Sequence, residues 1–93
     1  MDTVRIENMT RVGRWGTGWY IRTNHLHPST GEEIIHEFVT DDFGRGLKKW
    51  DSVGGIWVWL IEEHGFRLPY HRSHAREKFL RWFRKYLAQQ PER

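Results

Sequence analysis

The chain has 93 residues, the size of one small domain, and it contains no cysteine. The lack of cysteine excludes disulfides, thiolate zinc sites and cysteine nucleophiles, and it favours an intracellular protein, which we expect to be cytoplasmic. Residues 1–66 carry seven basic and ten acidic side chains, whereas residues 67–93 carry eight basic and two acidic ones. The net charge of +3 therefore arises from a basic C-terminal part, and the other two thirds of the chain are acidic.

The N-terminal half has the pattern of an antiparallel sheet. Residues 3–7 alternate apolar and polar side chains, which predicts a short strand. Residues 18–25 and 34–40 are rich in β-branched and aromatic side chains and flank a Pro-Ser-Thr-Gly turn at residues 28–31, so they predict a hairpin. On the second strand, Ile34, His36 and Phe38 share one face because side chains alternate along a strand.

Two middle segments are harder to assign. Residues 41–50 begin with two aspartates and end with two lysines before a tryptophan, a distribution that suits a short helix, although Gly44 and Gly46 oppose it. Residues 56–61 are apolar at every position, so periodicity cannot separate a helix from a strand. We interpret residues 53–64 as a buried helix that ends at Gly65, with a strand as the alternative, and no apolar run approaches the roughly 20 residues of a membrane span.

The last element is an amphipathic helix over residues 73–89, with Ser73 as its expected N-cap. Its expected apolar face consists of Ala75, Phe79, Leu80, Trp82, Phe83, Tyr86 and Leu87. We also assign Trp57 and Trp59 to the core. Strands followed by helices predict an α+β fold, in which a small antiparallel sheet packs against C-terminal helices in a single domain over residues 1–93.

Basic residues gather on the other face of that helix and just before it. The expected nucleic-acid-binding side chains are Arg72, Arg76, Lys78, Arg81, Arg84 and Lys85. Such side chains neutralise phosphates and give salt-dependent affinity, although an ordinary solvated helix face has the same composition. The expected function is a non-enzymatic module that contacts nucleic acid or a nucleic-acid-handling protein complex.

The six tryptophans suggest a second class of function, because they cannot all be buried in so small a domain. The expected exposed partner-binding residues are Arg14, Trp15, Trp19, Tyr20 and Arg22. Exposed aromatic rings can stack on bases or anchor a protein partner. The alternative function is therefore a small inhibitor or immunity-type protein, of the kind that phages and mobile elements encode, which blocks one protein target.

Histidines raise a third possibility. His25 and His27 share a strand face, and a hairpin register that placed His36 opposite them would supply three imidazoles for zinc. The register required is demanding and Pro28 bends the chain beside His27, so we expect no metal and no other cofactor. A small nuclease stays the third candidate, with no catalytic residue assigned, because neither carboxylates nor histidines converge in the sequence.

Overall fold

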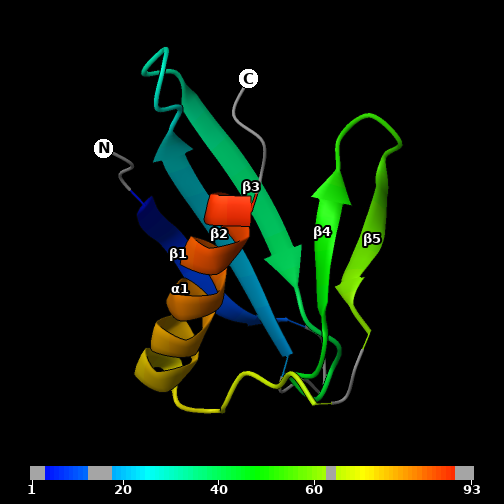
Figure 1. Ribbon diagram of the computed structural model, residues 1–93. Helices are drawn as coiled ribbons and strands as arrows, with labels where there is room; N and C mark the ends of the chain where they lie inside the picture. Colours follow the sequence, from blue (N-terminus) through cyan, green and yellow to red (C-terminus); the bar gives the residue numbers. More distant parts are fainter. Residues whose placement is uncertain (1–3, 13–17, 63–64, 90–93) are drawn as a thin grey trace.

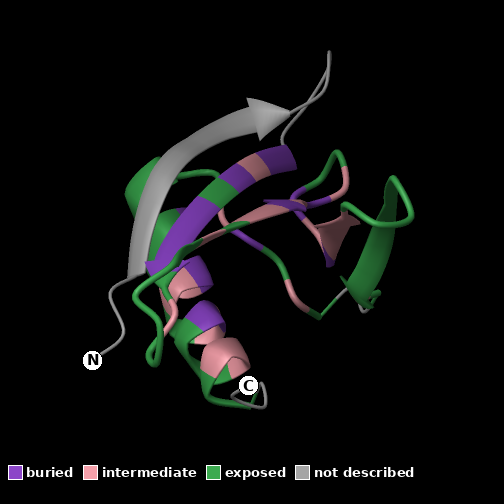
Figure 2. Cartoon of the chain, turned by 90° about the horizontal axis from the view of Figure 1, so that it is seen from above, coloured by how far each residue is buried: buried purple, intermediate pink, exposed green. Residues whose placement is uncertain are grey.

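The computed structural model of the protein describes residues 4–12, 18–62 and 65–89. Five antiparallel strands follow the chain order across one sheet: β1 (Val4–Val12), β2 (Gly18–Leu26), β3 (Glu33–Val39), β4 (Leu47–Asp51) and β5 (Ile56–Ile61). One helix, α1 (Arg72–Gln89), follows the sheet and packs against one of its faces (Figures 1 and 2). This arrangement is the α+β fold that the sequence predicts, with one C-terminal helix in place of two.

The expected hairpin is formed by β2 and β3. Its register pairs Thr23 with His36 and Ile21 with Phe38, so all four side chains face α1. The turn closes with a hydrogen bond from the Gly31 N–H to the His27 carbonyl oxygen, at 2.9 Å. Gly31 has a φ of 72°, a conformation that glycine adopts without the strain of a side chain.

Residues 41–46 form a compact turn, and the short helix expected from residue 41 is wrong. Asp41 Oδ1 accepts hydrogen bonds from the backbone N–H groups of Phe43 and Arg45, each at 2.8 Å. Gly44 and Gly46 have φ values of 76° and 69°, which a right-handed helix does not contain. Residues 47–51 then continue as β4.

The helix expected over residues 53–64 is also wrong, because residues 56–61 form β5, the alternative that periodicity left open. Asp51 Oδ1 accepts a hydrogen bond from the Val53 N–H, and the Asp51 carbonyl oxygen accepts one from the Gly55 N–H. Gly55 has a φ of 66°, so Gly54-Gly55 reverses the chain where the sequence analysis expected a helix to begin. Trp57 and Trp59 are 37% and 39% exposed, so their assignment to the core is corrected as well.

The core lies between α1 and the sheet. Ala75, Phe79 and Phe83 are buried on the helix, and the buried core includes Trp19, Ile21, Phe38, Leu47 and Leu68 from the rest of the chain. Trp82, Tyr86 and Leu87 are partly buried around this cluster, as the helical periodicity predicts. The described residues contain no helix long and apolar enough to cross a membrane.

The helix begins slightly earlier than expected. The Ala75 N–H donates to the His71 carbonyl oxygen, so His71 occupies the N-cap position and Ser73 lies within the first turn. The Ser73 hydroxyl is instead 2.7 Å from Nδ1 of His71. The N-cap role of Ser73 is therefore wrong, although the helix extends to Gln89 as predicted.

Candidate functional site

Helix α1 carries a concentration of exposed positive charge, and Arg81, Arg84 and Lys85 lie on its side away from the core. We call basic surface the five exposed cations of the helix: Arg72, Arg76, Arg81, Arg84 and Lys85. Glu77 is the one acidic residue of α1. None of the five cations has an ion pair with any residue that the structure describes. Their guanidinium and ammonium groups therefore face solvent with their donors available to an anion.

The sixth predicted phosphate contact, Lys78, lies differently. Its ammonium group donates a hydrogen bond to the Arg67 carbonyl oxygen at 2.5 Å and lies 5.3 Å from the centre of the Phe66 ring. These contacts attach α1 to the segment that precedes it. Lys78 is thus engaged within the protein, unlike the five cations of the basic surface.

The predicted aromatic surface is only partly present. Trp19 is 3% exposed, and its indole N–H donates to the Pro69 carbonyl oxygen at 3.0 Å, so its expected exposure is wrong. Tyr20 and Arg22 point to the opposite face of the sheet, because neighbouring residues of a strand alternate. Arg14 and Trp15 lie outside the described residues.

We call open face the side of the sheet opposite α1, over which the described residues place no other element (Figure 2). Tyr20 donates a hydrogen bond there to Glu37, and this bond, together with burial and the nearby negative charge, raises the pKa of the phenol. Arg22 is exposed beside this pair, across from Glu37 in the register of β2 and β3.

A tryptophan cluster on β4 and β5 continues the open face. Trp50 and Trp57 are opposite each other in the register, with ring centres 5.2 Å apart, and Lys48 Nζ lies 4.6 Å from the centre of the Trp59 ring. Trp57 and Trp59 are exposed aromatic side chains that the sequence analysis assigned to the core. The signal was the Gly54-Gly55 pair between two β-prone segments, which predicts a hairpin and hence alternating faces.

His25 and His36 are neighbours beneath α1, while His27 lies in the turn. The two rings are parallel and stacked, with centres 5.1 Å apart, and Nδ1 of His27 accepts a hydrogen bond from the Ser29 N–H. Burial, the charge of Lys49 and the neighbouring His25 lower the pKa of His36 to about 4. The described residues contain no group of three histidine or carboxylate side chains that converge as metal ligands.

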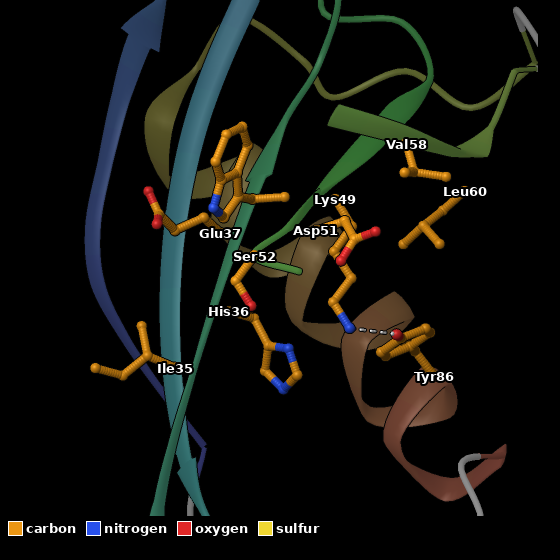
Figure 3. Close-up of a pocket in the computed structure, with 10 residues that line it drawn as sticks. Ile35, His36, Glu37, Lys49, Asp51, Ser52, Val58, Leu60 and Tyr86 are labelled. Carbon is orange, nitrogen blue, oxygen red and sulfur yellow. Dashed lines mark hydrogen bonds between the residues drawn. The ribbon is translucent and has the colours of Figure 1, made fainter. Parts of the chain in front are cut away.

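A cleft of about 630 Å³ opens where β3 and β4 diverge. These strands pair only at Phe38–Lys49 and Val39–Lys48, so the rest of β3 is separated from the β4–β5 hairpin (Figure 1). Val58 and Leu60 line one side of the cleft, and Lys49 crosses it to donate a hydrogen bond to the Tyr86 hydroxyl at 3.2 Å (Figure 3).

Comparisons with protein-family models, curated proteins and solved structures found no match to this chain. The functional argument therefore rests on the chain's own geometry, above all on the basic surface of α1.

Proposed function

We propose that this protein is a non-enzymatic module that binds nucleic acid through the basic surface of α1. The observation that supports the proposal most strongly is the exposure of five cations on one helix, none of them ion-paired within the described chain. Arg81, Arg84 and Lys85 lie within one turn or little more, so they present charge to a single stretch of a polyanion.

Electrostatics favours a polyanion over an ordinary protein surface as the partner of this helix. Each phosphate that a lysine or arginine neutralises releases a counterion, which makes binding favourable at low salt without reading base sequence. The arginines also offer bidentate hydrogen bonds to phosphate oxygens. We therefore expect weak sequence preference and strong salt dependence.

Fluorescence anisotropy with labelled single-stranded and duplex oligonucleotides of both DNA and RNA tests the proposal. At low salt, Arg81→Glu should weaken binding about tenfold or more, because it removes a phosphate contact and adds a repulsive charge. Arg22→Glu is the matched control, since it makes the same charge change at an exposed position on the open face. It should change the affinity by about twofold or less.

Two results would contradict the proposal. The first is no binding to any of these oligonucleotides at about 50 mM salt. The second is an equal loss of affinity in Arg81→Glu and Arg22→Glu, which would indicate a response to net charge alone. An inhibitor of one protein target would then become the better proposal, with the open-face residues Tyr20 and Arg22 as its candidate anchors.

A further inference from the structure

We infer that β5 pairs with β5 of a second copy of this chain, in an antiparallel and two-fold symmetric arrangement. The strand is the last in the sheet order and has β4 as its neighbour on one side (Figure 1). No described segment lies along its outer edge. The outward N–H and C=O groups of such an edge are a template for another strand.

The composition of β5 lacks the usual protection of an edge strand. Proteins commonly block edges with charged residues or proline, yet Ile56–Ile61 contains neither. Five consecutive apolar side chains from Ile56 to Leu60 are 37–56% exposed. The five cations of the basic surface lie on α1, whereas β5 carries no charged residue, so the apolar strand requires a partner of different chemistry from a polyanion.

A second copy fits this strand on both faces. Residues that are opposite each other in an antiparallel pair point to the same face. A two-fold axis perpendicular to the sheet must therefore pass between the two copies of one residue, which are then opposite each other. An axis at Val58 pairs Ile56 with Leu60 on the helix side and Trp57 with Trp59 on the open face. Leu60 is the extra residue at the register shift between β4 and β5, so β5 is regular from Ile56 to Trp59 and an axis nearer to Ile61 would lie on the irregular part of the strand.

The exposed area sets the strength of this contact. If all five side chains were fully covered, they would bury about 400 Å² per copy, or about 800 Å² in total, below the roughly 1,200 Å² of stable interfaces. The dimer is therefore weak, and its population depends on the protein concentration. Because the axis is perpendicular to the sheet, both α1 helices lie on the same side of one continuous sheet.

Sedimentation velocity tests the inference over protein concentrations from about 5 µM to about 500 µM. The protein is treated with nuclease and kept in about 0.5 M salt, so that bound nucleic acid does not contribute to the result. Wild type should shift from monomer to dimer over this range. Val58→Lys and Val58→Glu should each stay monomeric, since each places like charges opposite each other on the axis. An equimolar mixture of the two variants should recover the dimer, because opposite charges then meet.

The control is Val53→Lys, which adds the same charge at a side chain that is 96% exposed in the β4–β5 turn. It should dimerise like wild type. Near-ultraviolet circular dichroism shows whether each variant is folded. If the Val58 variants are unfolded, hydrogen exchange of the wild-type protein tests the β5 pairing in their place. Alternate β5 amides should then be protected at high concentration and exchange on dilution. A wild-type protein that stays monomeric, a mixture that stays monomeric, or β5 exchange independent of concentration would overturn the inference.

Discussion

The His25 and His36 rings stack 5.1 Å apart with an angle of 3° between their planes, beneath the edge of the Phe83 ring. Lys49 from β4 adds positive charge near them, and Phe38 contacts His36 from the same strand. Burial disfavours the protonated form of His36, and the positive charge of Lys49 and the neighbouring His25 disfavour it further. This is the physical reason that its pKa falls from 6.5 to about 4.

Protonation of His36 should make the fold acid-sensitive. Because the folded pKa lies below the unfolded one, the unfolded chain binds the proton more tightly, so the free energy of unfolding falls as pH drops from about 6.5 to about 4. The loss from this group is smaller than the roughly 3 kcal/mol of the full shift, because solvent around the partly exposed ring screens its charge. Urea unfolding at several pH values measures this. The free energy of unfolding of His36→Gln should depend less steeply on pH than that of the wild-type protein. His74→Gln, at an exposed position on α1, should keep the wild-type profile, and parallel profiles for all three proteins would contradict the argument.

Phe83 joins the helix to the sheet. Its side chain is fully buried, with ring centres of His36, Phe38 and Phe79 within 5.5–5.7 Å. Phe83→Ala should lower the free energy of unfolding by about 3–5 kcal/mol, because it leaves a cavity at the centre of the core. Thermal and urea unfolding measure this, with Arg84→Ala as the exposed neighbour that should change stability by about 0.5 kcal/mol or less. A Phe83→Ala protein as stable as Arg84→Ala would contradict the packing described above.

Gly31 and Gly46 have similar φ values but different surroundings. Substitutions at the two positions therefore distinguish the cost of backbone strain from the cost of a steric clash. Gly31 has open space where a Cβ would lie, whereas a Cβ on Gly46 would lie 2.7 Å from Cζ3 of Trp59 and 2.8 Å from the Ile61 carbonyl oxygen. Gly31→Ala should therefore cost about 1–2 kcal/mol from strain alone, and Gly31→Val somewhat more. Gly46→Ala should cost more than Gly31→Ala, since β5 must also move. Equal unfolding free energies for the two alanine variants would show that the close approach at Gly46 is relaxed in solution.

Trp19 connects β2 to the segment that leads into α1. Trp19→Phe removes the hydrogen bond to the Pro69 carbonyl oxygen and leaves space in the core, so it should cost about 1–3 kcal/mol. Trp57→Phe, on the exposed β5, should cost about 0.5 kcal/mol or less when measured at low protein concentration. If both substitutions had the same effect on urea unfolding, the contrast between a buried and an exposed tryptophan would be wrong.

Local sequence patterns were sufficient to predict the buried face of each element that has a clear periodicity. The spacing of Phe79 and Phe83 placed the buried face of α1, and the alternation of His36 and Phe38 placed the buried face of β3. The same rule applies to β2: charged Arg22 marks the exposed face, so Trp19 and Ile21 belong to the buried one. The arginines near Trp19 indicate an exposed surface, but Arg22 and Trp19 lie on opposite faces of β2.

The exposure of Ile56, Val58 and Leu60, on the helix side of β5, depends on the arrangement of α1 and the sheet, which no local pattern contains. A helix is about 10 Å wide and strands are about 4.8 Å apart, so one helix covers two or three strands. Five strands therefore leave an edge uncovered, and the position of α1 over the earlier strands leaves β5 exposed (Figure 2). A uniformly apolar run normally indicates a buried segment. Residues 56–61 are such a run, yet no described helix or strand covers β5.

The slope of affinity against salt concentration should count the phosphate contacts of the basic surface. For duplex DNA, the logarithm of the association constant falls with the logarithm of salt concentration by about 0.9 per neutralised phosphate. Arg81→Ala and Arg84→Ala should each make this slope shallower by about one, because each removes one contact without adding a negative charge. Anisotropy titrations between about 50 and 200 mM salt measure the slopes. Arg22→Ala, on the opposite side of the sheet, should leave the slope unchanged, and equal slopes in all four proteins would show that the phosphates lie elsewhere.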